Sequence, residues 1–321
     1  MLSRVADSLY WMSRYLERAE HTARLIDVGL NLMLDQTPAA AERRWGRLLV
    51  SLHAPAQLAG SSDAHQIAQA LTFDASNETS IVSCIASARE NLRQVREQIS
   101  SEMWEQLNRL YLQVRETRLD DIWNVSTHEF FRSVKEGAHL FQGITDATMN
   151  HGEGWQFIQV GRHMERAGAT ATLLDVYASE FLAPDGADAG GPKSYLDWVG
   201  LLKACTAFEA YCKVYTADLR PERIAEFLLL NAEWPRSVRF AADVMQAAFQ
   251  AISEATGARK SGRVNRLAGR LRASLGFGQI DEIMETGLHA YLNDVRRQCA
   301  QIHEAIVQTY VAYQVETALA T

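Results

Sequence analysis

The sequence is poor in the residues that interrupt regular structure. Its 321 residues include 19 glycines and six prolines, together about 8% of the chain. Average usage would give roughly 12% for the two together. So few breakers favour long helices over a β fold, which needs many turns. The hydrophobic content of 47% excludes a disordered chain and is sufficient for a large core.

Other absences limit the function. The four cysteines are scattered without a CxxC pair, so neither a disulfide framework nor a clustered thiol site is predicted. No run of 18 apolar residues could span a membrane, and Asp7 and Arg14 stand where a secretory signal would be apolar. Acidic residues outnumber basic ones, 39 to 32, which argues against nucleic-acid binding. We expect a cytoplasmic protein that binds neither membranes nor nucleic acids.

Apolar residues recur at steps of three and four along most of the chain, as on one face of a helix. No stretch alternates as a half-buried strand would. The sequence predicts an all-α helical bundle of about eight to eleven helices. The clearest helical segments are 9–30, 78–115, 157–174, 195–217, 222–256 and 279–315.

The chain contains an internal repeat. Residues 14–28 and 162–176 are identical at nine of fifteen positions, and weaker matches follow at offsets of 150 to 154. We expect an internal duplication whose two similar halves, 1–150 and 151–321, pack as one body about a pseudo-twofold axis. The Pro/Gly-rich segment 183–192 is predicted to be an exposed loop inside the second half.

Both copies of the repeat carry the same charged stripe. An exposed face is free to change after duplication, yet these charges are retained as well as the apolar positions. Two alternatives remain open: the charges pair between the halves as a structural polar centre, or they line a groove that binds an anionic group. The residues of this stripe are Arg14, Glu17, Arg18, Arg162, Glu165 and Arg166.

A polar segment joins the two halves. Thr145, Asp146 and Thr148 belong to it, and we expect a loop that borders any groove between the halves. Their side chains suit either helix capping or ligand contacts.

One spacing is typical of metal-binding helix bundles. Glu136-x-x-His139 has the i, i+3 spacing of di-iron sites, but the corresponding Glu285-x-x-x-His289 is one residue longer. We therefore interpret these histidines as packed side chains and predict no metal and no cofactor.

Several motifs resemble those of a known family. The opening segment 2–20, Ser101-Glu-Met-Trp104, the segment 143–149, Gly154-Trp155 and Glu165-Arg166-Ala167 are together similar to the Alpha-E family, named for an alpha-helical domain with a Glu-Arg motif. The resemblance spans nearly the whole chain and places the motif at Glu17-Arg18 and Glu165-Arg166. It implies a companion of circularly permuted ATP-grasp ligases, in an amide-ligase or peptide-modification system.

The sequence lacks a phosphate-binding loop and a GxGxxG motif, so the ATP-binding catalyst is not expected here. We expect an accessory protein that binds an ATP-grasp ligase-like protein or its peptide substrate. The alternative is an enzyme that holds an anionic or aminoacyl substrate through the duplicated Arg/Glu stripes, as a transferase would. A metal–carboxylate helix bundle is the least favoured reading.

Overall fold

A computed structural model describes residues 3–32, 38–181, 192–216, 218–256 and 262–311. Within these ranges the regular structure is helical, without a strand, as predicted. The α-helices are α1 (Ser3–Leu32), α2 (Pro38–Ser51), α3 (Ala64–Thr72), α4 (Ile81–Gln94), α5 (Ser101–Glu116), α6 (Leu119–Ile122), α7 (Thr127–Thr148), α8 (Glu153–Phe181), α9 (Pro192–Ala204), α10 (Phe208–Tyr215), α11 (Pro221–Leu230), α12 (Val238–Thr256), α13 (Gly262–Phe277), α14 (Ile280–Thr286) and α15 (Leu288–Ile306). Short helical turns are η1 (Ala56–Leu58), η2 (Arg96–Gln98) and η4 (Val307–Val311).

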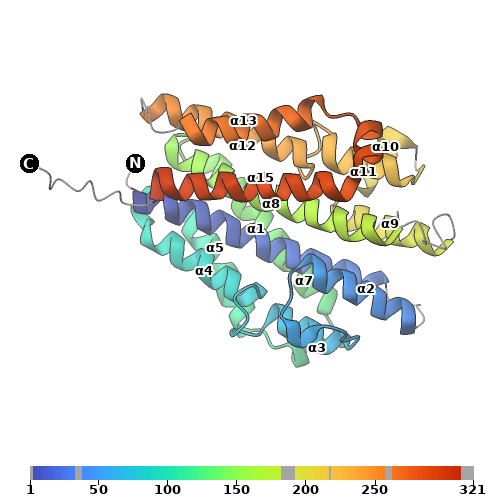
Figure 1. Ribbon diagram of the computed structural model, residues 1–321. Coiled ribbons are helices and arrows are strands. Elements are labelled where there is room, and N and C mark those ends of the chain that lie inside the picture. The colour runs from blue at the N-terminus through green and yellow to red at the C-terminus, as the bar shows by residue number, and fades with distance from the viewer. Residues whose placement is uncertain (1–2, 33–37, 182–191, 217, 257–261, 312–321) are drawn as a thin grey trace, which may run out of the picture.

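Two long helices, α1 and α8, pack against each other at the centre of the molecule. Helix α1 also packs against α4 and α7, and α8 packs against α12 and α15. Helix α5 closes the α4/α7 side, while α13 closes the α12/α15 side. Figure 1 shows α4, α5 and α7 on one side of the central pair and α12, α13 and α15 on the other.

The apolar stripes of the sequence explain why α1 and α8 are central. Leu9, Met12 and Leu16 of α1 are buried, as are Val160 and Ala167 of α8. These side chains recur at helical spacing, so each helix presents a continuous apolar face.

The two helix backbones approach closely at Gly161 of α8. A Cβ atom there would lie 2.3 Å from the Tyr10 carbonyl oxygen and 2.1 Å from Ser13 Oγ. Only glycine fits this approach, and it brings the charged residues of α1 and α8 within reach of one another.

Several expected helices are shorter than predicted. The described ranges contain fifteen α-helices rather than about eight to eleven. The 78–115 segment is divided after Gln94, and α5 begins where the Ser100 side chain accepts a backbone N–H and caps a new helix. The 195–217 segment breaks before α10, where Thr206 takes a left-handed φ of 52°.

The joining segment also differs from the prediction. Thr145, Asp146 and Thr148 lie in the last turns of α7 rather than in a loop. The Thr145 hydroxyl donates to the Phe141 carbonyl and the Thr148 hydroxyl to the Ile144 carbonyl, bonds that are compatible with a continuing helix. The predicted exposed loop at 183–192 falls almost entirely outside the described residues, at 182–191. Among the described residues, no helix combines the length and the apolar character needed to cross a membrane.

Candidate functional site

The charged stripes of α1 and α8 meet where these helices pack. Arg14 Nε and Arg18 Nε of α1 donate to the Glu165 carboxylate of α8, at 2.8 and 2.6 Å. In return, Arg166 Nε of α8 donates to Glu17 Oε1 of α1 at 2.7 Å. Each helix therefore supplies a glutamate to the arginines of the other. Five of the six residues predicted from the repeat meet in these ion pairs.

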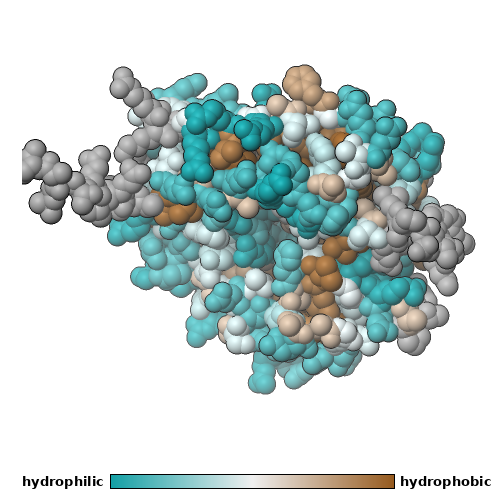
Figure 2. Space-filling model, in the orientation of Figure 1, coloured by the Kyte–Doolittle hydropathy of each residue, from teal (hydrophilic) through white to brown (hydrophobic). Residues whose placement is uncertain are grey.

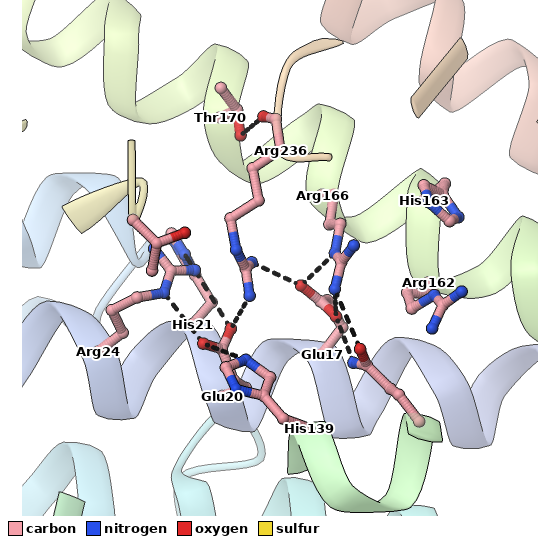
Figure 3. Close-up of polar contacts among 12 residues, drawn as sticks. Glu17, Glu20, His21, Arg24, His139, Arg162, His163, Arg166, Thr170 and Arg236 are labelled. Carbon is pink, nitrogen blue, oxygen red and sulfur yellow. Dashed lines mark hydrogen bonds and ion pairs between the residues drawn. The ribbon is translucent and has the colours of Figure 1, made fainter. Parts of the chain in front are cut away.

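The Glu17 side of this centre contains a second arginine, from the segment between α11 and α12. Arg236 donates from Nη1 to Glu17 at 2.8 Å and from Nη2 to Glu20 at 3.0 Å. Arg24 Nε donates to Glu20 at 3.0 Å. Figure 3 shows Arg166 and Arg236 directed from one side toward the glutamates of α1. Both carboxylates are almost fully buried, with exposed fractions of 2% for Glu17 and 0% for Glu20.

All three carboxylates stay ionised at neutral pH. Burial by itself would raise the pKa of Glu17, but the charges of Arg166 and Arg236 lower it to about 2. Burial likewise opposes ionisation of Glu20 and Glu165, yet their arginine partners hold both pKa values below the usual range. A carboxylate saturated by guanidinium donors is a poor general base, so this geometry favours ion pairing over proton transfer.

Arg162 is the sixth predicted residue, and its hydrogen bond goes to Gln159 of its own helix. Burial, together with the charge of Arg166, lowers the pKa of Arg162 to about 10. Near the Glu17–Arg166 pair, Gln142 of α7 donates to Glu17 at 3.2 Å and accepts from Arg166 at 3.3 Å. A neutral amide therefore takes part in the polar centre on this side.

The two sides of the centre differ in packing. A cavity of about 470 Å³ opens beside Arg14, Arg18 and Glu165, a volume within the range of small-molecule sites. On the other side, the cavity bounded by Glu17 and Arg236 is only about 10 Å³. Figure 2 shows a shaded hollow near the middle of the visible face. In Figure 1, helices α15 and α4 border the same region. Among the residues that the structure describes, those lining the 470 Å³ cavity do not include Thr145, Asp146 or Thr148.

These three residues make structural contacts. Asp146 Oδ1 accepts from Trp155 Nε1 at 3.0 Å, which ties the end of α7 to the start of α8. Thr148 Oγ1 lies 2.7 Å from Ser100 Oγ.

Two further ion clusters, one around Asp27 and one around Asp175, lie beyond the centre and were not predicted. Asp27 of α1 accepts from Lys135 Nζ at 2.5 Å and lies 2.6 Å from His128 Nδ1. Asp175 of α8 accepts from Arg296 at 2.7 Å and lies 2.7 Å from His289 Nδ1. Both aspartates are identical positions of the repeat, and the two basic residues of each cluster have the same His-x6-Lys/Arg spacing, so the sequence did contain a signal.

Arg236, Glu20 and Arg24 are further members that sequence reasoning missed. The i, i+4 spacing of Glu20 and Arg24 on α1 could have indicated their pair. Arg236 gives no local signal, because it reaches Glu17 across 219 residues.

The site offers little for metal or nucleophilic chemistry. Among the described residues, no group of three or more His, Cys, Asp or Glu side chains is placed to hold a metal ion. Glu136 faces Arg132 at 3.8 Å, while His139 lies 3.5 Å from Glu20. Cys299 lines the cavity, but burial raises the pKa of its thiol to about 12, so it is not a thiolate at neutral pH.

Comparison with known proteins gives a family match over nearly the whole chain. Residues 1–311 match the Alpha-E family model, described as a predicted alpha-helical domain with a conserved ER motif. Uncharacterised proteins of Mycobacterium bovis and Mycobacterium tuberculosis are 25% identical over 325 residues, covering 94% of this chain. The match spans only 35% of the length of those relatives. No solved structure matches significantly. With a family match over nearly its whole length, the chain belongs to the Alpha-E family.

Proposed function

We propose that this chain is a helical accessory protein of an ATP-grasp amide-ligase or peptide-modification system, with the crossed Glu-Arg pairs as its polar centre. The structural part rests on the reciprocal ion pairs of the two central helices: Glu17 of α1 binds Arg166 of α8, and Glu165 of α8 binds Arg18 of α1. Saturated, buried carboxylates suit a scaffold better than an acid–base catalyst. The mycobacterial relatives support a partner role, since the matched unit is about a third of a longer chain there.

We also propose that the fold arose by duplication of a unit of about 150 residues, 1–150 and 151–321, packed as one body. The reciprocal pairs at Glu17 and Glu165 support it, as do the similar clusters at Asp27 and Asp175. The packing of α4 and α7 on α1 resembles that of α12 and α15 on α8.

Co-purification tests the accessory role. The tagged chain would be co-expressed with the circularly permuted ATP-grasp protein encoded nearest to it, and the complex isolated and sized. We expect a stoichiometric complex and faster ligase turnover with this chain present. Failure to associate, together with unchanged ligase activity in its absence, would contradict the accessory role.

The second candidate is an enzyme that binds an anionic or aminoacyl substrate. One observation favours it, namely the cavity beside Arg14, Arg18 and Glu165. A folded Glu165→Gln variant that kept full turnover in the reconstituted system would remove a catalytic role for this carboxylate.

A further inference from the structure

The cavity beside Arg14, Arg18 and Glu165 lies where the two sides of the centre differ at one position. Arg236 immediately precedes Ser237, the residue before α12, and its side chain fills the space against Glu17. Thr79 immediately precedes Ser80, the N-cap of α4, and lines the cavity on the Glu165 side. A threonine thus stands where the other side has an arginine, and the volume beside Arg14 and Arg18 stays open.

Among its arginines and their carboxylate partners, the cavity wall carries one positive charge in excess. Arg14 and Arg18 share the single carboxylate of Glu165, with which both form ion pairs. Arg296 also lines the cavity, but its charge is balanced by Asp175 at 2.7 Å. Burial and Arg14 lower the pKa of His303, so this imidazole is neutral at pH 7. An unbalanced charge in a partly buried site is costly, and a ligand with one negative charge would balance it.

Two buried polar atoms among the lining residues have no hydrogen-bond partner in the protein, His21 Nε2 and Ser51 Oγ. The exposed fractions of these residues are 8% and 6%. Arg24 Nη2 donates to His21 Nδ1 at 3.1 Å, so in the neutral ring the proton is on Nε2. Buried donors are nearly always satisfied in folded proteins, and a rotation of either side chain into the cavity would let a ligand oxygen satisfy it.

We propose that this cavity binds the free carboxylate of an amino acid or short peptide, with Arg14 and Arg18 facing the carboxylate and Ser51 and His21 as further donors. This proposal rests on the second candidate function for the location of the site. It concerns binding alone and does not require that the chain catalyse a reaction.

The lining favours a carboxylate over a phosphate. A phosphate group carries close to two charges at pH 7, whereas the wall offers one. Much of the remaining surface is apolar, from Leu52, Leu71, Met164 and Ala300. This surface suits the uncharged body of a peptide, while the planar guanidinium groups suit its carboxylate.

Calorimetric titration of the purified full chain tests the proposal. The probes are N-acetyl-L-alanine and N-acetyl-L-alanyl-L-alanine, the C-terminal amides of both, and inorganic phosphate, each at pH 7. We expect saturable binding of one carboxylate probe per chain and at least tenfold weaker binding of its amide. Stronger binding of phosphate than of either carboxylate, equal binding of acid and amide, or no binding of any probe would overturn the proposal.

Two variants localise the binding. Thr79→Arg places an arginine where the closed side has one, and we expect at least tenfold weaker binding. Ser51→Ala removes a hydroxyl without a protein partner, so the fold should be unaffected while affinity falls several-fold. Ser87→Arg is the matched control, because it adds the same charge on α4 outside this cavity.

The outcomes separate the proposals. Unchanged binding in folded Thr79→Arg and Ser51→Ala variants would overturn the assignment to this cavity. Peptide binding without a ligase complex would remove only the accessory role, and a ligase complex without peptide binding would remove only the cavity proposal. Binding without turnover would remove only the enzyme candidate.

Discussion

The carboxylate of a single buried residue, Glu17, accepts hydrogen bonds from side chains of two helices and a loop. Arg166 and Arg236 both donate to its carboxylate, and Gln142 adds an amide. Replacing the carboxylate with an amide of similar shape removes the charge and leaves two buried guanidinium groups with a weaker partner.

Glu17→Gln is therefore expected to lower the free energy of unfolding by about 3–5 kcal/mol, the cost of breaking a buried ion pair. Urea unfolding followed by circular dichroism measures the difference. Glu136→Gln is the matched control, since that carboxylate is 71% exposed and lies 3.8 Å from Arg132. The control should cost under about 0.5 kcal/mol. Equal losses in the two variants would contradict a stabilising role for the centre.

Acid is expected to destabilise the fold in two stages, the first from buried histidines. Burial lowers the pKa of His21 to about 3 and that of His163 well below its usual value. As pH falls below about 6.5, the unfolded chain takes up protons that the folded chain excludes, so stability falls by up to about 1.4 kcal/mol per pH unit for each histidine. Unfolding free energies at pH 7, 6 and 5 measure this slope. A flat profile over this range would show that the two rings titrate normally.

The second stage comes from the carboxylates. The pKa of Glu17 is about 2 in the folded protein and about 4.3 in an unfolded chain. Its contribution to stability is complete above the unfolded value and is lost as pH falls toward 2. The Glu17→Gln variant should lose less stability than the original chain between pH 4.5 and 2.5, by the same urea measurement. An unchanged slope in that variant would argue against the lowered pKa.

At the scale of the element, the contact of α1 with α8 depends on Gly161. A Cβ there would meet the Tyr10 carbonyl oxygen at 2.3 Å, so a larger residue must push the helices apart. The ion pairs of Glu17 and Glu165 span this same interface, and their short distances require the close approach.

Gly161→Ala is expected to destabilise the protein by about 1–3 kcal/mol or more, as overpacking does. Gly168→Ala on the same helix is the control, because a Cβ there meets nothing within 4 Å. In a helix that exchange should add up to about 1 kcal/mol of stability. Thermal unfolding of the two variants compares them, and a Gly161→Ala variant as stable as the control would rule out the tight contact.

The sequence predicted part of this interface. Apolar periodicity predicted long helices around 9–30 and 157–174, because burial on one face imposes that spacing. The repeat also singled out Glu17 and Glu165, whose charges meet the arginines of the opposite helix. It did not predict Arg236, because its contact joins distant segments that only tertiary packing brings together. The helix breaks near 95–100 and 205–207 depend on local caps and backbone angles, which periodicity does not report.

At the scale of the whole molecule, the two central carboxylates, Glu17 and Glu165, find their arginine partners in the opposite half. Glu17, Arg14 and Arg18 lie in 1–150, whereas Arg166, Arg236 and Glu165 lie in 151–321. The apolar faces of α1 and α8 are likewise buried against each other. The halves should therefore fold together as one cooperative unit.

Separate expression of 1–150 and 151–321 tests this cooperativity. We expect each fragment alone to lack a cooperative thermal transition, since its buried charges lose their partners. Co-expression should restore a one-to-one complex, measured by gel filtration and circular dichroism. A stable, monomeric 1–150 fragment with a sharp transition would show that the centre is not needed for folding.

The distance along the chain between Glu17 and Arg236 has a consequence for synthesis. The two residues are 219 positions apart, and both lie in the buried centre. As the polypeptide leaves the ribosome, Glu17 emerges long before Arg236, the last of the arginines that neutralise its carboxylate. The nascent N-terminal portion therefore stays incompletely packed until the segment that carries Arg236 has been translated.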